Sequence, residues 1–363
     1  MRAVKNVIRK TAVFFATGIL SVGSIMFNGC SHSQYENPTG GLSEMEHSEL
    51  FKPLYEEIPI MLEPLAALDE KDNFHVYLCF GQSNMEGQNW NGTTLTFSDV
   101  IPQQYKTGVD PRFRVMAAVS GSYRISSTQN EQRVQGQWYT AVPPLVRNNT
   151  GISPADYFGR TLVAGIADTS IKIGVIVVAV AGAAIEGFEK GSGANTYFNG
   201  QPDWMRQIAV SSYGGNPYQR LVDLAKEAQK TGVIKGIIMH QGESGAASGN
   251  WAQKVRGIYN NLLNDLGLEQ NSIPFLAGQP YGADRNINNA STINGLTNTM
   301  TAALPNGDNV AHVISSNGCG HGGDNLHFSY EGYKTLGERY GQKMLELNYK
   351  PATSIKQVTS RPN

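Results

Sequence analysis

Serine, aspartate and histidine occur in this sequence in an arrangement that suits nucleophilic catalysis. Ser83 follows an apolar segment, and Asp324 and His327 lie three positions apart in a loop before the last helical pattern. A serine hydroxyl is a weak nucleophile until an imidazole accepts its proton, and a carboxylate holds that imidazole in the required tautomer. We therefore expect Ser83 to be the nucleophile, His327 the base and Asp324 the residue that orients the base.

Acyl transfer also requires hydrogen-bond donors that point at the developing oxyanion. Three candidate donors follow apolar segments: the backbone N–H of Ser83, the backbone N–H of Gly182 and the side-chain amide of Gln241. A glycine at position 182 lets the backbone approach a substrate closely. The sequence thus predicts an oxyanion hole formed by these three groups.

Other polar side chains surround these candidates. Gln82, Asn84 and Glu243 are expected to shape the site, and Glu243 could also transfer a proton, because a carboxylate beside a catalytic centre can have a shifted pKa. His240 and His321 are the rival imidazoles. His240 ends an apolar segment and is expected to be a hydrogen-bonded core histidine. His321 lies in a glycine-rich loop, where it could contact substrate.

These residues must be positioned by a regular framework, and the sequence predicts one of alternating strands and helices. Continuously apolar segments predict strands covered on both faces by helices. The predicted strands are 75–80, 171–181, 236–241, 274–277 and 310–315. Apolar stripes at helical spacing predict helices over 221–228, 251–266 and 333–344. This alternation indicates a three-layer α/β/α fold with a mostly parallel five-stranded sheet, and such folds bind ligands at the carboxyl ends of their strands.

The first 30 residues are expected to be an export signal. Four basic residues and no acidic residue lie in the first ten positions, and an uncharged, largely apolar stretch follows over 11–27. This order is typical of a secretory signal, and the stretch is short for a transmembrane span, which needs about 20 apolar residues. Because Cys30 directly follows Gly29 as in a lipobox, we expect a lipoprotein, periplasmic or at the cell surface. A cleaved, secreted protein and an uncleaved anchor are the alternatives.

The rest of the chain is expected to be one folded domain with irregular ends. Residues 31–70 are polar with several prolines and glycines, which predicts a tether and an irregular lead-in. The domain itself is expected over 71–350, and 351–363 as a loose tail.

The charge balance argues against a nucleic-acid partner. The formal net charge is −1, and removal of residues 1–30 takes away four of the 29 basic residues and none of the 30 acidic ones, which leaves −5. Nucleic-acid binders usually carry a basic excess. Contact with a membrane is expected only through a lipidated Cys30.

The remaining cysteines, histidines and glycines do not indicate a metal or cofactor site. Cys79 and Cys319 are expected to be two separate buried thiols, with a disulfide between them as the alternative. Together with His321 and His327 they do not form a recognisable zinc spacing. The run at 318–323 contains G-x-G-x-x-G, but no helical pattern begins directly behind it. No cofactor and no metal are therefore expected.

Three sequence blocks resemble a known enzyme family. FGQSNMEG at 80–87, HQGES at 240–244 and DNLHF at 324–328 are similar to the blocks of the SGNH-type carbohydrate esterases. The resemblance is closest to carbohydrate esterase family 6, the acetylxylan esterases, within the sialate O-acetylesterase-like superfamily. Similar stretches occur at 137–145, 153–160 and 174–186, and the resemblance covers about residues 72–346.

This resemblance implies a flavodoxin-like SGNH fold, no metal and hydrolysis of acetyl esters on sugars. It implies the same roles for Ser83, His327 and Asp324, and it places Gln241 where related SGNH enzymes use an asparagine in the oxyanion hole. Where the family usually has two glycines after the second strand, this chain has Ala181-Gly182. If the second of these positions supplies the oxyanion donor, Gly182 can serve. If the first does, Ala181 can donate its N–H only with backbone angles that suit a residue with a Cβ.

The sequence thus predicts a serine esterase that removes O-acetyl groups from a carbohydrate, with acetylated xylan or its oligosaccharides as the expected substrate. A sialate O-acetylesterase is the alternative with the same catalytic parts, because fold and chemistry do not fix the sugar. An inactive surface glycan-binding lipoprotein is the alternative of another class. Four aromatic residues could stack on a sugar or belong to the packing: Trp90, Trp138, Tyr139 and Trp204.

Overall fold

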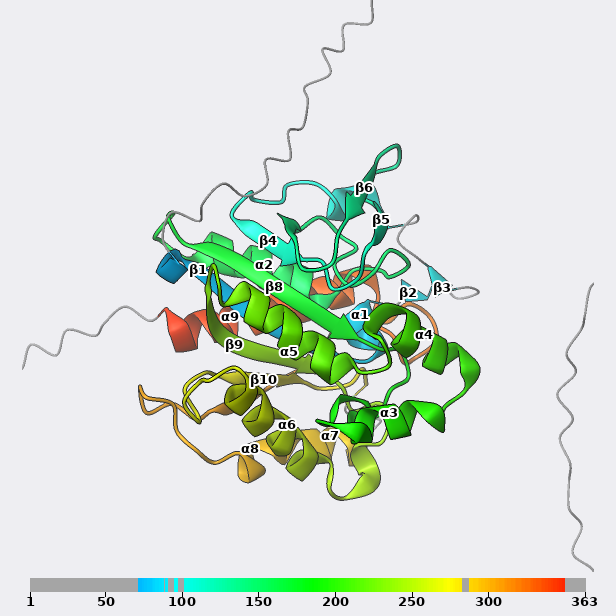
Figure 1. The fold of residues 1–363 in the computed structure, drawn as a ribbon, viewed down its shortest axis with the longest axis vertical. Helices are drawn as coiled ribbons and strands as arrows, with labels where there is room; N and C mark the ends of the chain where they lie inside the picture. Colours follow the sequence, from blue (N-terminus) through cyan, green and yellow to red (C-terminus); the bar gives the residue numbers. More distant parts are fainter. Residues whose placement is uncertain (1–70, 88, 91–94, 97–100, 283–286, 350–363) are drawn as a thin grey trace, which may run out of the picture. The chain divides into compact units, whose positions relative to one another are not determined.

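A seven-stranded sheet lies at the centre of the fold, with the strand order β11-β10-β9-β1-β8-β4-β7 (Figure 1). The computed structural model describes residues 71–87, 89–90, 95–96, 101–282 and 287–349. The strands of this sheet are β1 (Phe74–Gly81), β4 (Phe113–Met116), β7 (Trp138–Thr140), β8 (Lys172–Ala179), β9 (Val233–His240), β10 (Phe275–Gly278) and β11 (Ala311–Ile314). All neighbouring pairs are parallel except β4 and β7, which pair antiparallel.

The mostly parallel α/β architecture is confirmed, whereas the expected count of five strands is wrong. The five predicted strands correspond to β1, β8, β9, β10 and β11. The sheet is extended beyond β8 by β4 and β7, which have only four and three residues. Strands this short form because they pair with a neighbouring strand. They are too short to show a periodic apolar pattern in the sequence.

Helices cover both faces of the sheet. The described helices are α1 (Ser83–Glu86), α2 (Pro154–Gly165), α3 (Ser192–Asn199), α4 (Asp203–Tyr213), α5 (Pro217–Ala228), α6 (Trp251–Asp265), α7 (Ile287–Asn294), α8 (Leu296–Thr299) and α9 (Tyr330–Asn348). In Figure 1, α5 and α6 lie in front of the sheet and α2 and α9 behind it. The three predicted helices are α5, α6 and α9, which confirms the three-layer arrangement.

Local sequence explains where the longer helices begin. The Ser153 hydroxyl accepts a hydrogen bond from the N–H of Ala155, and Pro154 occupies the first position of α2. Asn216 and Pro217 start α5 in the same way. A polar cap satisfies an N–H that lacks an intrahelical partner, and proline tolerates the first helical position because it has no N–H to satisfy.

Shorter elements connect this framework. The single-turn 3₁₀ helices are η1 (Lys71–Asn73), η3 (Gln103–Tyr105), η4 (Ile185–Phe188) and η5 (Ala246–Ser248). Among the described residues, two small antiparallel pairs lie outside the central sheet: β2 (Asn89–Trp90) with β3 (Leu95–Thr96), and β5 (Gly121–Arg124) with β6 (Asn130–Arg133).

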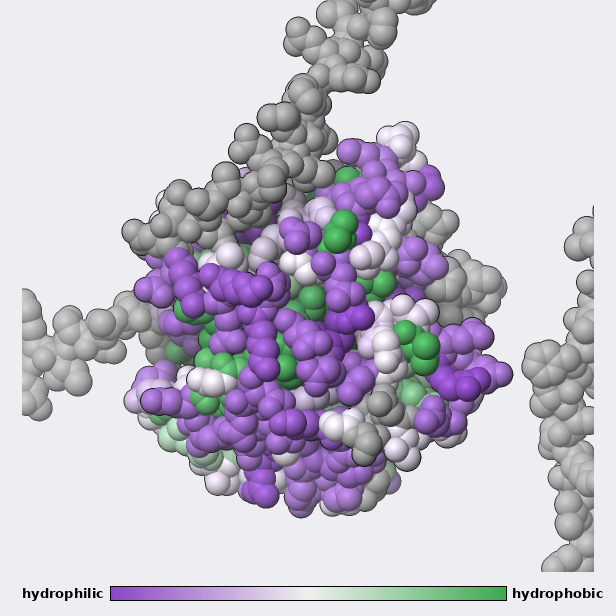
Figure 2. All heavy atoms as spheres, in the orientation of Figure 1, coloured by the Kyte–Doolittle hydropathy of each residue, from purple (hydrophilic) through white to green (hydrophobic). Residues whose placement is uncertain are grey.

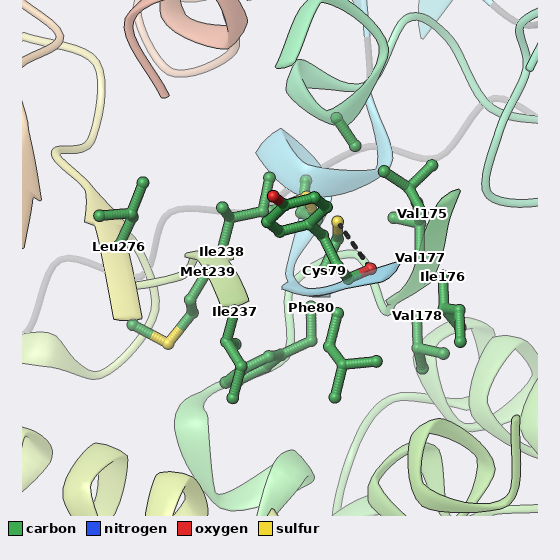
Figure 3. Packing of buried hydrophobic residues seen from close by; sticks show 14 of the residues in the cluster. Cys79, Phe80, Val175, Ile176, Val177, Val178, Ile237, Ile238, Met239 and Leu276 are labelled. Carbon is green, nitrogen blue, oxygen red and sulfur yellow. Dashed lines mark hydrogen bonds between the residues drawn. The ribbon is translucent and has the colours of Figure 1, made fainter. Parts of the chain in front are cut away.

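The core lies on both faces of the central strands. Every residue of β1 is buried, and β8 is buried from its second residue onward. Alternate side chains of β1 serve opposite layers, because Tyr77 packs edge-on against Phe158 of α2 while Phe80 contacts Phe188 of η4. Figure 3 shows the apolar side chains of β1, β8 and β9 side by side in this core. Full burial of one such side chain contributes roughly 1.5–3 kcal/mol, so this layer is a rigid base for the loops beyond it.

The carboxyl ends of β1, β8 and β9 are tied together by backbone contacts. The N–H of Gln82 donates to the carbonyl of His240 at 3.1 Å, and the N–H of Val180 donates to the carbonyl of Gly81 at 3.0 Å. Gly81 has a φ of +156°, and a Cβ there would lie 2.0 Å from the His240 carbonyl oxygen. Only glycine lets β1 end this close to β9, and the loop that carries Ser83 starts at this point.

Several predictions on the chain ends lie outside the described residues. These are the export signal at 1–30 with Cys30, the tether at 31–70 and the tail at 351–363. Within the described part of the chain, no helix combines the length and apolarity needed to cross a membrane. Cys79 and Cys319 are separate buried thiols, as expected.

Candidate active site

Ser83, His327 and Asp324 form one hydrogen-bonded line at the carboxyl end of the sheet. The Nε2 atom of His327 lies 2.9 Å from the Oγ atom of Ser83. The Nδ1 atom of the same ring lies 2.5 Å from the Oδ2 atom of Asp324. Ser83 is the first residue of α1, directly after β1, while the other two residues lie in the loop before α9. The structure therefore brings the three predicted residues together in the geometry that proton transfer from the serine requires.

The Asp324 carboxylate is held in place by its own loop. Its Oδ1 atom accepts hydrogen bonds from the N–H groups of Leu326 at 3.0 Å and His327 at 2.8 Å. Partial burial opposes ionisation of Asp324, but the hydrogen bonds from the backbone and ring of His327 outweigh it and lower the pKa of Asp324. An ionised Asp324 fixes which ring nitrogen of His327 carries the proton, so the other nitrogen faces Ser83 as an acceptor.

Asn84 braces the histidine loop against the serine turn. Its Nδ2 group donates to the carbonyl of Leu326 at 3.1 Å, and its Oδ1 atom accepts the N–H of Phe328 at 3.3 Å and the hydroxyl of Tyr333 at 2.8 Å. These contacts hold the residues on either side of His327. Asn84 thus connects the histidine loop to the serine turn, and its role in shaping the site stays a prediction.

Glu243 and His240 form a buried pair next to this brace. The Oε1 atom of Glu243 accepts from Asn84 at 2.6 Å and lies 3.1 Å from Nε2 of His240. Burial opposes ionisation, but the attraction of His240 and the two hydrogen bonds outweigh it and lower the pKa of Glu243. The Oε2 atom is buried without a hydrogen-bond partner among the described residues. His240 is fully buried and also faces Tyr340, which fits the expected core histidine.

Two backbone N–H groups remain available for an oxyanion. Within the described residues, neither the N–H of Ser83 nor that of Gly182 donates to a backbone acceptor. Ser83 occupies the first turn of α1, where helix geometry supplies no intrahelical acceptor. Gly182 has a φ of +74°, and a Cβ at this position would lie 2.8 Å from the Trp204 ring and 2.9 Å from the Met205 methyl carbon. The positive φ favours glycine at 182, and a Cβ there would also displace the ends of the Trp204 and Met205 side chains.

The Gln241 side chain is placed differently from the expectation. Its amide nitrogen donates to the carbonyls of Ser244 at 2.7 Å and Ala183 at 3.3 Å, and to Oε1 of Gln82 at 3.1 Å. Its Oε1 atom accepts the indole N–H of Trp251 at 2.5 Å. These partners allow only one orientation of the amide and occupy both of its hydrogens. The predicted oxyanion role of the Gln241 amide is therefore contradicted, and Gln241 joins the loops around the site instead.

Gln82 has a similar connecting role. Its Oε1 atom accepts from Gln241, from the N–H of Ser244 at 3.1 Å and from the N–H of Gly242 at 3.4 Å. The loops after β1 and β9 are thus joined through one buried amide oxygen. The site-shaping role of Gln82 stays a prediction.

Glu86 and Arg147 form a buried connection that residue type and spacing did not predict. Glu86 is fully buried; its Oε1 atom accepts the N–H of Ala181 at 3.0 Å, and its Oε2 atom accepts from Arg147 at 3.0 Å. Burial disfavours the charged guanidinium, but the Glu86 carboxylate outweighs it and raises the pKa of Arg147. Glu86 therefore connects the helix of Ser83 to the residue before Gly182. The sequence signal was a carboxylate three positions after the predicted nucleophile.

A cavity of about 580 Å³ opens beside the Ser83 hydroxyl. Its lining residues are Gln82, Ser83, Arg147, Asn149, Ala181, Gly182, Trp204, Ile208, Glu243, Ser244, Leu326 and His327. A volume of this order is typical of small-molecule sites. Ser83, His327, Gly182 and Arg147 thus all face one cavity.

Of the aromatic residues and the histidine considered as substrate contacts, some line the cavity and others belong to the packing or to loops. Trp204 lines the cavity, whereas Trp138 packs edge-on against Phe74 and the Tyr139 hydroxyl accepts the N–H of Val134. The side chain of Trp90 lies outside the described residues. His321 does not line the cavity; its Nδ1 atom accepts the N–H groups of Gly323 and Asn325 and so organises its own loop.

The fold and this arrangement of groups are those of an SGNH-type carbohydrate esterase. Residues 73–346 match the family described as carbohydrate esterase, sialic acid-specific acetylesterase. The match spans most of the chain, so the protein belongs to the family of sialic acid-specific acetylesterases among the carbohydrate esterases. Carboxylic ester hydrolysis on an acetylated carbohydrate is the activity of this class.

One solved structure shares the fold of this chain, and two further structures align with lower scores. A protein from Arabidopsis thaliana aligns with a TM-score of 0.54 at 20% sequence identity, over 76% of this chain and 99% of that chain. A lipase from a goat rumen metagenome aligns with a TM-score of 0.34 at 10% identity, over 73% and 94% of the two chains. A carbohydrate esterase family 2 enzyme with a carbohydrate-binding domain, from Corynascus, aligns with a TM-score of 0.36 at 12% identity, over 75% and 66%.

Proposed function

We propose that this protein is a serine esterase that removes O-acetyl groups from a carbohydrate through an acetyl-enzyme on Ser83. The observation that carries the proposal is the hydrogen-bonded line from Ser83 Oγ through His327 to Asp324, at 2.9 Å and 2.5 Å, of which Ser83 and His327 line a cavity. A carboxylate, an imidazole and a hydroxyl in this order generate a nucleophile at neutral pH.

The geometry supports a two-step reaction. His327 Nε2 takes the Ser83 proton as Oγ attacks the acetyl carbonyl, and the N–H groups of Ser83 and Gly182 stabilise the oxyanion. His327 then donates that proton to the departing sugar oxygen, which leaves the acetyl group on Ser83. A water molecule then gives a proton to His327 and attacks the acetyl carbonyl. His327 returns this proton to Ser83 Oγ, and acetate is released. One oxyanion donor typically contributes on the order of 10²–10³ in rate.

For the sugar, we propose acetylated xylan or its oligosaccharides as substrate. The support is the resemblance of the three sequence blocks to acetylxylan esterases. The second candidate is an O-acetylated sialic acid, which the description of the matching family favours. Both substrates present an acetyl ester on a ring hydroxyl, and the proposed catalytic groups serve either one.

Acetate release from the two substrates tests both levels of this proposal. Wild-type protein should release acetate from acetylated xylan faster than from O-acetyl sialic acid, and the Ser83→Ala variant should release it from neither. The reverse preference would replace the substrate and keep the mechanism. A Ser83→Ala variant with wild-type rates would overturn the mechanism. Glycan binding without acetate release by the wild type would favour a binding protein on an esterase scaffold.

We also propose that the esterase is exported and anchored by a lipid on Cys30. The support is the basic start, the uncharged stretch and the Gly29-Cys30 pair of the sequence. Expression with labelled palmitate should label the wild-type chain but not a Cys30→Ser variant, and the variant should leave the membrane fraction. Equal labelling of both chains would overturn the anchor.

A further inference from the structure

Trp204 is an unusually placed aromatic residue beside the reactive groups. It is the second residue of α4, its accessible fraction is 52%, and it lines the same cavity as Ser83 and His327. Only four large apolar residues of the described chain are exposed in this way: Val134, Trp204, Val210 and Leu326. Two of the four, Trp204 and Leu326, line this cavity. An exposed cluster of apolar side chains at a cavity is informative, because burial would stabilise each of them.

The indole lies beside one of the two candidate oxyanion donors. A Cβ on Gly182 would lie 2.8 Å from the Cη2 atom and 3.6 Å from the Cζ2 atom of Trp204. The benzene part of the indole therefore lies against the Gly182 backbone. An acetyl carbonyl that accepts a hydrogen bond from Gly182 brings the atoms beyond its ester oxygen into the neighbourhood of this ring.

The helix beneath Trp204 holds the ring outward. Met205 and Ala209 are buried, and the N–H of Ala179 at the end of β8 donates to the Tyr213 hydroxyl at 3.3 Å. These contacts anchor one face of α4 on the sheet. Trp204 and Ile208, one helical turn apart, then lie on the face that lines the cavity. Figure 2 shows a small hydrophobic spot over α4 in a surface that is otherwise mostly hydrophilic or intermediate.

Leu326 supplies a second apolar surface from the histidine loop. It directly precedes His327, its accessible fraction is 44%, and its carbonyl is held by Asn84. The lining also contains polar side chains, among them Arg147, Asn149 and Ser244. A cavity with both apolar and polar walls matches a pyranose ring, whose C–H face is apolar and whose rim carries hydroxyl groups.

We propose that Trp204 is the platform on which a pyranose ring of the substrate stacks, with Leu326 covering the same ring from the histidine loop. This inference rests on the proposed function and deepens it, because it names a residue that binds the sugar part of the acetyl ester. Stacking of the sugar ring orients the acetyl ester toward Ser83. Trp204 therefore contributes to catalysis only when the leaving group carries a ring.

Kinetics with a ringed and a ringless acetate test the platform. Methyl β-xylopyranoside monoacetate carries a pyranose ring, whereas glycerol triacetate has none. The Trp204→Ala variant should lower the ratio of kcat/KM for the sugar acetate to kcat/KM for glycerol triacetate about tenfold, mainly through KM. Trp204→Phe should restore most of this ratio. The matched control is Val210→Ala, an exposed apolar residue on α4 outside the cavity lining, which should leave both values unchanged.

Other outcomes separate this inference from the proposed function. If Trp204→Ala lowers both kcat/KM values equally, or neither, the platform is wrong while the esterase stands. If the wild type hydrolyses neither acetate, the proposed function fails. In that case, titration calorimetry with a xylo-oligosaccharide tests the platform by itself. Trp204→Ala should weaken binding of this oligosaccharide about tenfold, and equal affinities of the two proteins would overturn the platform.

Discussion

His327 Nε2 lies 2.9 Å from Ser83 Oγ although 244 positions separate the two residues in the chain. The serine follows the first strand of the sheet, and the histidine lies directly before the last helix. Their meeting depends on β1 lying at the middle of the sheet, between β8 and β9. In open α/β sheets this is where neighbouring connections diverge and leave a crevice for a ligand.

The first prediction concerns the carboxylate behind the histidine. Asp324→Asn should lower kcat by about 10²–10⁴ with little change in KM, because an amide no longer holds the imidazole in the required tautomer. The measurement is steady-state acetate release. The matched control is Asp223→Asn, an exposed residue on α5, which should retain wild-type kcat.

A loss of less than about tenfold would contradict the role of Asp324. The buried carboxylate of Glu243 would then be the next candidate, because it lies on the same cavity with an unpartnered Oε2 atom within the described chain. Glu243→Gln separates the two assignments in the same assay.

The second prediction concerns the link between Glu86 and the oxyanion loop. Glu86→Gln leaves Arg147 without its buried carboxylate, and the Arg147 side chain is only 14% exposed. We expect a loss of about 2–4 kcal/mol in the free energy of unfolding, measured with urea. We also expect kcat of the folded variant to fall about tenfold, because the single amide oxygen cannot accept from both Arg147 and the N–H of Ala181, the residue before the Gly182 donor.

The control for this variant is Glu227→Gln, which breaks the exposed ion pair with Lys230. Exposed pairs contribute about 0–1 kcal/mol, so this change should be small. A Glu86→Gln protein that is destabilised but keeps the wild-type kcat would show that the contact to Ala181 has no part in positioning the donor.

The third prediction is a pH dependence of stability at Asp156 in α2. This carboxyl is fully buried and its Oδ2 atom has no hydrogen-bond partner within the described chain. Burial raises the pKa of Asp156 to about 6 from 3.8, and the neighbouring Arg160 offsets only part of the effect. Because the folded pKa is raised, the folded protein holds this proton more tightly than the unfolded chain does. Stability from this group is full below about pH 3.8 and is lost as the pH rises through about 6.

Asp156→Asn should remove this loss. The free energy of unfolding of the variant, relative to wild type, should increase between pH 4 and pH 7 by on the order of 2–3 kcal/mol. Arg160 keeps its hydrogen bonds to the carbonyls of Tyr105 and Thr107 in the variant. Urea titrations across this pH range provide the measurement, and a constant difference would contradict the raised pKa.

Much of the fold could be predicted because its strongest signals are local. Strands β1, β8 and β9 are buried on both faces and therefore read as continuous apolar segments. Helices α5, α6 and α9 are buried on one face and therefore read as apolar stripes at helical spacing. The short strands β4 and β7 could not be predicted in this way. Arg114 interrupts β4, and Trp138–Thr140 becomes a strand only by pairing with it.

The candidate site shows the same limit at the level of single side chains. Ser83, Asp324 and His327 were recognisable from residue type and spacing, and the structure brings them together; their catalytic roles stay predictions. Gln241 was placed wrongly, because the carbonyls that occupy its amide come from loops whose approach no spacing reveals. Glu86 was missed for a related reason, since its partner is the backbone N–H of Ala181.

Covalent labelling of Ser83 tests the central claim most directly. A fluorophosphonate reacts with a serine hydroxyl only when a neighbouring base activates it. Peptide mass spectrometry should find one label per chain, on Ser83, with acetate release lost in proportion to labelling and no labelling of a His327→Ala variant. Undiminished acetate release after full reaction with the probe, or a label on another residue, would contradict the account.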